Sequence, residues 1–346
     1  MNALTRKVPI LRQQEVGLVI VVILLCLLFG AFNSDFLTGD NLRNIFLAVA
    51  VVGIMAIGQC FVLIAGEIDL SVGSVLGFAG VCGAWLMQEG WDPVLGIVGG
   101  ILAGAACGVV TGFVVVYLKV NSFIVTLGML SIARGLTEVI TGGLPIEVPG
   151  SITFIGQGEA IGIPVAVIVF VGLVLVFQFV LSRSVAGQRV RAVGDNAEAA
   201  RISGIPLNRT RLLVFVLSGM LAGVAGIVYT TQVGVAEAQA GTGQELDVIA
   251  AVVIGGASLS GGRGSVVGAM LGAFLLGALR NAFILLQLSP FLQKVSIGLV
   301  IILAAIFDQA RQGAFKRAGG TVGGPLGPVL DPIVRLVRRR REPART

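Results

Sequence analysis

The chain reads IGIPVAVIVFVGLVLVFQFVL at 161–181, SRSVAGQRVRAVGDNAEAARISGIPLNRTR at 182–211 and LLVFVLSGMLAGVAGIVYTTQ at 212–232. The first and third segments are apolar and have about the 20 residues that a helix needs to cross a bilayer. Backbone groups inside a bilayer must bond within the protein, and runs of this length favour helices over the alternating strands of a barrel. This region therefore predicts two membrane helices joined by a polar loop.

The composition extends this prediction to the whole chain. Of the 346 residues, 56% are hydrophobic and 12% are charged, and the mean hydropathy is +0.99. A soluble domain of this length does not need so much apolar material, so we predict an all-α polytopic membrane protein. Histidine is absent. The cysteines lie in apolar runs without metal-ligand or disulfide spacing, and no metal site is expected: Cys26, Cys60, Cys82 and Cys107.

About ten spans can be drawn along the chain. The first could be a signal peptide, but its polar exit NSDFLTGDN (33–41) has no small-x-small cleavage site, so we expect a retained helix. The eighth is short and rich in glycine, and it is either a full crossing or a broken, re-entrant helix. The expected spans are 16–32, 44–65, 70–88, 94–117, 122–140, 161–181, 212–232, 246–260, 265–287 and 291–308.

Charge bias orients these spans. With the amino terminus in the cytoplasm, the outer loops hold one basic residue, Arg43, and the inner segments hold twenty. Lysine and arginine accumulate on the cytoplasmic side, so both termini and the 182–211 loop are expected inside. The chain then divides into a cytoplasmic amino terminus (1–15), a transmembrane permease-like domain (16–308) and a basic, disordered tail (309–346). The tail either touches anionic membrane lipid or only fixes the topology.

Glycine recurs every four residues in two spans. This spacing puts the glycines on one helix face, where a neighbouring backbone can approach closely. Such faces serve helix packing, or helices that slide during a transport cycle. The glycines are Gly96, Gly100, Gly104, Gly108 and Gly112 in the fourth span, and Gly264, Gly268 and Gly272 in the ninth.

The polar loop contains a short helix signal. Asp195 or Asn196 can cap its start, Glu198 stands where a capping box places an acid, and Gly204 ends it. A helix of about two turns is marginal alone, so it either docks to a partner or is an inert connector on the membrane. The candidate docking residues are Gly194, Asp195, Asn196, Glu198, Ala199, Ala200, Arg201, Ser203 and Gly204.

Polar residues at membrane depth are costly, and they mark pathways or structural pairs. Asp69 with Ser71 either caps the third span or lines a pathway, and Arg134 with Glu138 forms either an ion pair on one helix face or a polar contact for a substrate. The candidate pathway residues are Glu67, Asp69, Ser71, Ser74, Asn121, Arg134, Glu138, Asp247, Ser258 and Asn281. The acidic starts at 66–74 and 245–248 suit an inverted repeat of spans 2–5 and 7–10.

Several classes of function are excluded by missing motifs. The chain has no G-x-x-x-x-G-K-[ST] nucleotide-binding loop and no nucleophile–base pattern, so we expect a transport subunit rather than an enzyme. No nucleic-acid partner is expected. A secondary transporter or channel is the main alternative, but it would leave the cytoplasmic helix unexplained.

Three blocks now resemble a known family, the permease subunits of bacterial ABC importers for ribose, xylose, arabinose, galactose and related monosaccharides, which also take up autoinducer-2. The blocks are GEIDLSVGSVLGFAG (66–80), AVGDNAEAARISGIPLNRTR (192–211) and ELDVIAAVVIGGASLSGGRGSVVGAMLGAFLLGALRNAF (245–283). The family usually has glycine where this chain has Glu67, and it usually reads G-G-N or G-x-N where this chain has Asp195. Branched-chain amino-acid permeases are relatives with a similar plan.

The resemblance implies a mechanism and a set of partners. Two permease copies, identical or paralogous, would form the pathway in the bacterial cytoplasmic membrane. Cytoplasmic ATPases would grip the 194–205 helix and bind ATP and Mg²⁺, so this chain itself would hold no cofactor. A periplasmic or lipid-anchored binding protein would deliver the sugar.

Overall fold

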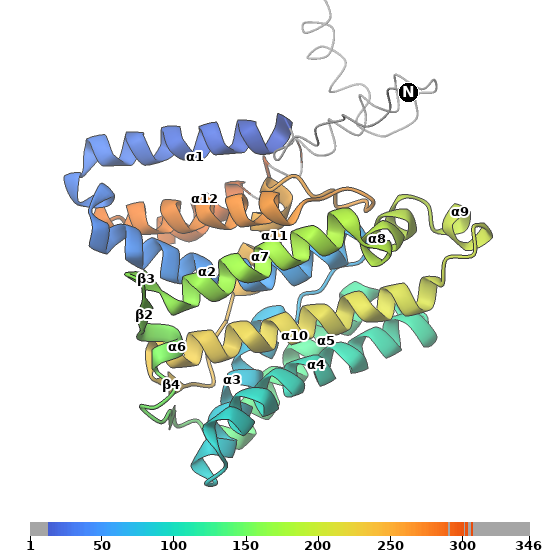
Figure 1. Ribbon diagram of the computed structural model, residues 1–346, viewed down its shortest axis with the longest axis horizontal. Coiled ribbons are helices and arrows are strands. Elements are labelled where there is room, and N and C mark those ends of the chain that lie inside the picture. The colour runs from blue at the N-terminus through green and yellow to red at the C-terminus, as the bar shows by residue number, and fades with distance from the viewer. Residues whose placement is uncertain (1–12, 290, 301, 304–305, 307–346) are drawn as a thin grey trace, which may run out of the picture.

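The computed structural model describes residues 13–289, 291–300, 302–303 and 306, so the predicted tail and the first twelve residues lie outside it. The described chain is almost entirely helical (Figure 1), which confirms an all-α polytopic membrane protein. The helices are α1 (Gln13–Phe32), η1 (Ser34–Leu37), α2 (Gly39–Ile64), α3 (Val72–Gln88), α4 (Pro93–Tyr117), α5 (Ser122–Thr141), α6 (Phe154–Gln157), α7 (Val165–Arg183), α8 (Val185–Asp195), α9 (Ala197–Ile202), α10 (Leu207–Val233), α11 (Gln244–Ile254), α12 (Val266–Leu285) and Phe291–Val300.

Four two-residue strands lie in the segments that connect the helices at one end of the bundle. Strand β1 (Ile146–Glu147) pairs antiparallel with β4 (Val235–Ala236), with Ile146 opposite Ala236. Strand β2 (Glu159–Ala160) pairs antiparallel with β3 (Ile163–Pro164). The first pair ties the link after α5 to the link after α10.

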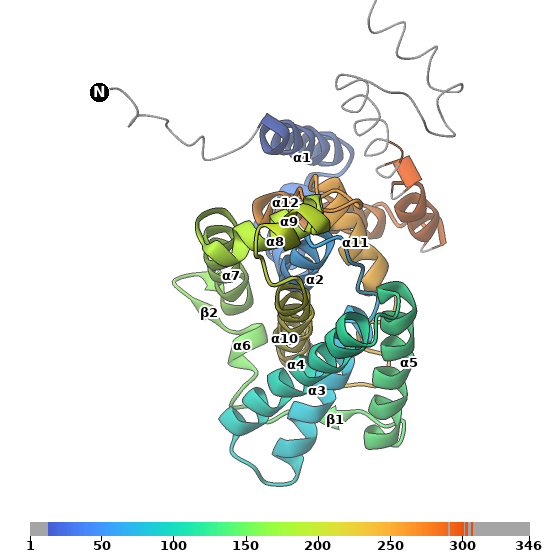
Figure 2. The same cartoon turned by 90° about the vertical axis from the view of Figure 1, so that its right-hand side faces the viewer.

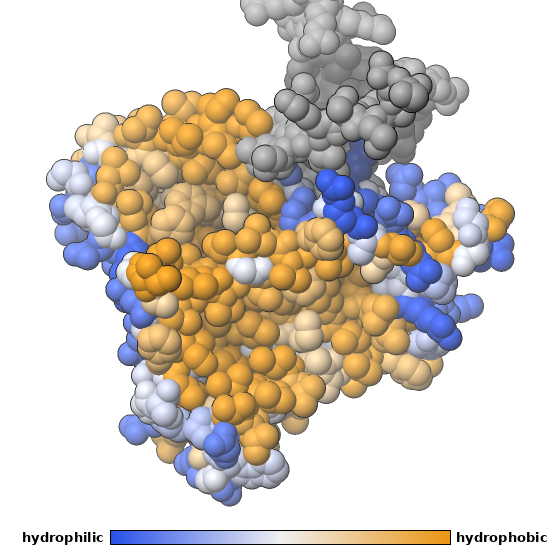
Figure 3. Space-filling view, viewed as in Figure 1, coloured by the Kyte–Doolittle hydropathy of each residue, from blue (hydrophilic) through white to orange (hydrophobic). Residues whose placement is uncertain are grey.

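Seven of the described helices are long and apolar enough to cross a membrane: α1, α2, α4, α5, α7, α10 and α12. The third expected span is the 17-residue α3, and only part of the tenth, Phe291–Val300, is described. In Figure 3 the apolar surface forms a broad band across the helices, with hydrophilic residues gathered at both ends. This arrangement is what a bilayer requires of a spanning bundle.

Helices α2 and α10 form the centre of the bundle. Helix α10 packs against α4, α2 and α3, and α2 also packs against α12, α11 and α7 (Figures 1 and 2). Most of α2 is buried, including Ile54, Met55 and Leu63, whereas α1 touches the bundle mainly along α12. Because α2 and α10 contact most of the other spans, their positions set the geometry of the bundle.

The eighth expected span is not one continuous helix. Its helix, α11, has only 11 residues, and at 1.5 Å per residue that is about half the thickness of a bilayer core. The link before it approaches the first turns of α3: a Cβ atom at Gly77 would lie 2.8 Å from the carbonyl oxygen of Ala240. Of the two forms expected for this segment, the structure has the broken one, but it is not re-entrant: the link before α11 starts at β4, and the turn after α11 reaches Ile64 and Gly194 at the opposite end of the bundle (Figure 1).

Candidate functional site

The polar loop forms two helices, α8 and α9. Asn196 ends α8 and caps α9, since its side-chain oxygen accepts from the backbone N–H of Ala199 at 2.9 Å. Gly204 follows α9 with a φ of 76°, a left-handed conformation that glycine adopts without strain. Helix α9 exposes Glu198, Arg201 and Ile202, and 76% of the Ile202 surface is open. An apolar side chain so exposed on a polar helix is suited to contact a partner.

Helix α8 was missing from the sequence prediction. Ser184 caps its start by accepting from Gly187 N–H, and its buried Val190 and Val193 face a bundle surface that α7, α10 and α2 supply. The apolar spacing of these two valines was the available signal. The arginines on either side of Val190 made the segment polar overall, so the spacing of the valines was not used to predict a helix.

The end of α8 is attached to the bundle through backbone contacts. Gly194 lies against the carbonyl group of Ile64, at the end of α2, and a Cβ atom there would also lie 2.7 Å from the backbone nitrogen of Gly262. The Gly262 N–H donates to the same Ile64 oxygen at 2.8 Å. Arg191 donates to the carbonyl of Gly264 at 3.0 Å. Helix α8 therefore meets α2 and the α11–α12 turn at one point.

The acidic segment between α2 and α3 holds two carboxylates in different settings. Glu67 pairs with Arg211, near the start of α10, at 3.3 Å. Asp69 is buried, and it accepts from the Ser71 hydroxyl at 2.6 Å and from the Ser218 hydroxyl at 2.8 Å. The Asp69 side chain thus fastens α10 to the start of α3 and does not open to a pathway in this conformation.

Arg134 does not form the expected ion pair with Glu138. Its guanidinium turns across to the link before α11, where it donates to the carbonyl oxygens of Ala238 and Ala240, the second at 2.9 Å. It also reaches the Ser74 hydroxyl at 3.4 Å. The partners of Arg134 lie 60 to 106 positions away in sequence, so helical spacing could not reveal them.

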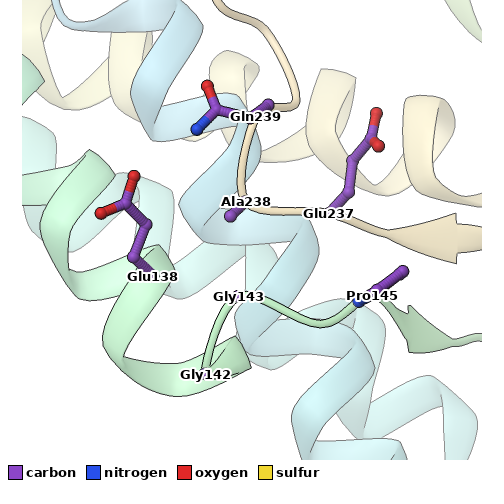
Figure 4. A pocket seen from close by; sticks show the side chains of 7 residues that line it. All are labelled: Glu138, Gly142, Gly143, Pro145, Glu237, Ala238 and Gln239. Carbon is purple, nitrogen blue, oxygen red and sulfur yellow. The ribbon is translucent and has the colours of Figure 1, made fainter.

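Glu138 instead borders a pocket of about 560 Å³. Figure 4 shows its side chain on the last turns of α5, across the pocket from Glu237 and Gln239 on the link between α10 and α11. Glu237 accepts from the Tyr229 hydroxyl at 3.1 Å. Glu237 and Gln239 were not predicted as pathway residues, because nothing in their spacing places them beside α5. The pocket is lined by Glu138, Gly142, Gly143, Pro145, Glu237, Ala238 and Gln239.

The remaining pathway candidates are dispersed. Asp247 is buried and pairs with Arg280, which joins α11 to α12. Asn281 and Asn41 exchange hydrogen bonds through their amides at 2.7 and 2.8 Å. Ser258 lies buried in the α11–α12 turn, and Asn121 caps α5 from an exposed position. Among these candidates the structure brings together Asp69 with Ser71 at the start of α3, and Ser74 on α3 with Arg134 on α5, whereas Glu138 lies apart at the pocket.

The two glycine faces both meet neighbouring backbone. On α4, a Cβ atom at Gly104 would lie 2.5 Å from the carbonyl oxygen of Gly219 in α10, and Gly96 and Gly100 approach α3 in the same way. Gly108 and Gly112 also face α10. On the other face, Gly268 and Gly272 approach α11, and Gly264 approaches Ile64.

The residues that the structure describes contain no group of three or more cysteine or acidic side chains able to hold a metal ion. Three ion pairs join segments far apart in sequence: Arg43–Glu159, Arg211–Glu67 and Arg280–Asp247.

Comparison with known proteins identifies the family to which the chain belongs. Residues 41–305 match the family model described as the branched-chain amino acid transport system / permease component. The chain is 37% identical to the L-arabinose ABC transporter permease protein of Azospirillum brasilense, over 86% of this chain and 88% of that one. It is 39% identical to the ribose import permease protein of Bacillus subtilis, over 86% and 94%. It is 36% identical to the L-arabinose transport system permease protein of Escherichia coli, over 87% and 92%.

No solved structure matches the chain. The family model covers well over half of the sequence, and the relatives align over nearly all of their own lengths. The resemblance seen in the three sequence blocks is therefore confirmed. This multi-pass membrane protein belongs to the family of branched-chain amino acid transport system permease components, as a permease subunit of an ABC transporter without an ATPase domain of its own.

Proposed function

We propose that this permease imports a pentose, arabinose or ribose, across the bacterial cytoplasmic membrane. The observation that carries the proposal is the identity of 36–39% to the three permeases named for these sugars, spread over nearly the whole of each chain. The family description names branched-chain amino acids, and these are the second candidate cargo.

The cytoplasmic pair α8–α9 supports coupling to a separate ATPase. In the proposed orientation both termini face the cytoplasm, and α9 presents the open face of Ile202 to that side. An ATPase that grips this face could move α2, because the end of α8 meets the end of α2 at Gly194. ATP and Mg²⁺ would be bound by that partner.

Two other partners complete the proposal. A second permease copy, identical or paralogous, would close the pathway, and a periplasmic or lipid-anchored binding protein would deliver the sugar to the outer end. The arrangement of helices supports an inverted repeat, since α2 packs against α12 while α10 packs against α4. In this repeat α2–α5 would correspond to α10, α11, α12 and the segment 291–300.

The proposal is tested by purifying the complex from its native membrane and measuring ATP hydrolysis in liposomes. L-arabinose, ribose and leucine are each added with the co-purified binding protein. We expect one of the pentoses to stimulate hydrolysis and to accumulate inside. Stimulation by leucine alone would assign an amino-acid cargo, and solute movement without ATP would overturn coupling to an ATPase.

Coupling through α9 is tested separately with Ile202→Asp. The exposed side chain makes little contribution to the fold, so the variant should insert normally. A charge in the centre of a partner interface should reduce sugar-stimulated hydrolysis about tenfold or more. Normal uptake by a correctly inserted variant would contradict the assignment of α9.

A further inference from the structure

The outer side of α5 is an uncovered helix face that carries open glycines together with polar side chains. Only 22% of its apolar window is buried within the chain, and α5 stands at one side of the molecule (Figure 2). Ser131 lies near its midpoint and is exposed, and Glu138 is exposed two turns further along the same face. The Ser131 hydroxyl reaches the Leu127 carbonyl at 3.4 Å, so the cost of facing lipid would fall on the Glu138 carboxylate.

The space beside this face is open rather than packed. Cβ atoms built at Gly128 and Gly135, which share the face, would meet nothing within 4 Å. The glycines of α4 behave differently, since each of those meets neighbouring atoms at less than 3 Å. The small residues of α5 therefore leave room beside the helix.

A second element borders the same space. Gln239 lines the pocket with Glu138, and Gln239 and Thr242 are exposed on the link between α10 and α11. Arg134 holds this link through the Ala238 and Ala240 carbonyls, and its backbone lies against the first turns of α3. The segment between β4 and α11 thus places polar groups along the whole distance from that strand to the start of α11.

We propose that the pentose passes along this face of α5, and that Glu138 and Gln239 hydrogen-bond to its hydroxyl groups in the pocket. A carboxylate accepts from hydroxyls and an amide both donates and accepts, which suits a neutral molecule that carries several hydroxyl groups. Ser131 continues the polar face toward the middle of the bundle. This inference rests on the proposed function and names the residues that serve it.

The first test asks whether the face of α5 that carries Gly135 is exposed to water, here called the wet face, or to lipid. Gly135→Cys is compared with Gly172→Cys, in a chain whose native cysteines are replaced by alanine and that still hydrolyses ATP with its partners. Gly172 on α7 is also open within 4 Å, but its face consists of Ile168, Leu175, Val176 and Phe179. Because thiolates form in water, we expect a membrane-impermeant thiol reagent to label Gly135→Cys at least tenfold faster in open membranes.

Labelling tests the wet face whether or not a sugar is transported. Equal, slow labelling of the two variants would overturn the inference even if the wild-type complex imports pentose. If Gly135→Cys is labelled rapidly but the complex imports no pentose, the proposed function is wrong, whereas the water exposure of this face of α5 is confirmed.

The second test addresses the ligand. Glu138→Gln preserves the size of the side chain and removes its charge, and we expect sugar uptake to fall about tenfold, the loss of one charge-assisted hydrogen bond. Added L-arabinose or ribose, with binding protein and ATP, should slow labelling of Gln239→Cys. Unchanged uptake by Glu138→Gln, or protection of Gln239→Cys by inorganic cations but by neither sugar, would overturn the sugar subsite.

Discussion

An ion pair forms on the exposed face of helix α9. Glu198 and Arg201 form an ion pair on α9, with the Arg201 Nε donating to a carboxylate oxygen at 3.0 Å. This hydrogen bond lowers the pKa of the Glu198 carboxyl below its ordinary value. A lowered pKa means that the ion pair is present above the ordinary glutamate pKa and is lost as the pH falls through the lower value.

We therefore expect Glu198 to titrate below a free glutamate, and Arg201→Gln to return its pKa to the ordinary value. The measurement is a carboxyl-carbon NMR titration of the protein in detergent, labelled at glutamate. A Glu198 pKa that is the same in both proteins would contradict the bond. Folding stability should change little, because an exposed ion pair contributes little to it.

Glu67 and Arg211 join the α2–α3 segment to the start of α10. Glu67 is the position where the resemblance expects glycine, and its side chain is only 12% exposed beside Arg211. We expect Glu67→Gln to lower the free energy of unfolding by about 1 kcal/mol, since Arg211 loses its partner in a partly solvated site.

The matched control is the exchanged pair, Glu67→Arg with Arg211→Glu. It should recover most of the stability that Glu67→Arg alone loses, as measured by titration with a denaturing detergent. An exchanged pair no more stable than the single variant would show that the two side chains do not interact.

At the scale of elements, close backbone approach decides which helices can pack. Gly104→Ala should destabilise the bundle by about 1–3 kcal/mol, because its new methyl group would collide with the Gly219 carbonyl of α10. Gly172→Ala is the control, since its Cβ meets nothing within 4 Å. Alanine favours helix over glycine by up to about 1 kcal/mol, so the control should be neutral or stabilising. Detergent unfolding of both variants measures the difference, and equal effects would refute the packing argument.

The sequence predicted elements better than it predicted contacts. Apolar runs and the Asn196 cap located the long helices and α9, because both signals are local. The partners of Arg134 could not be predicted, since the Ala238 and Ala240 carbonyls become neighbours only after α5 and the link pack against α3. Asp69 was left open between capping and lining a pathway for the same reason: its Ser218 partner lies 149 residues away.

At the scale of the whole molecule, orientation follows from charge and is open to a direct test. Ser203 is exposed beside α9 and Ser151 is exposed at the opposite end of the bundle, between β1 and α6. On intact cells, a membrane-impermeant thiol reagent should label Ser151→Cys and leave Ser203→Cys unlabelled until the membrane is opened. The reverse pattern would invert the proposed topology.

Three segments meet where Gly194, Ile64 and Gly262 touch through their backbones. The atoms nearest to Gly194 belong to the backbone of Ile64 and Gly262, and backbone cannot change rotamer to absorb a displacement. In the coupling that we propose, a displacement of α9 would therefore be passed directly to α2, a helix of 26 residues that is largely buried.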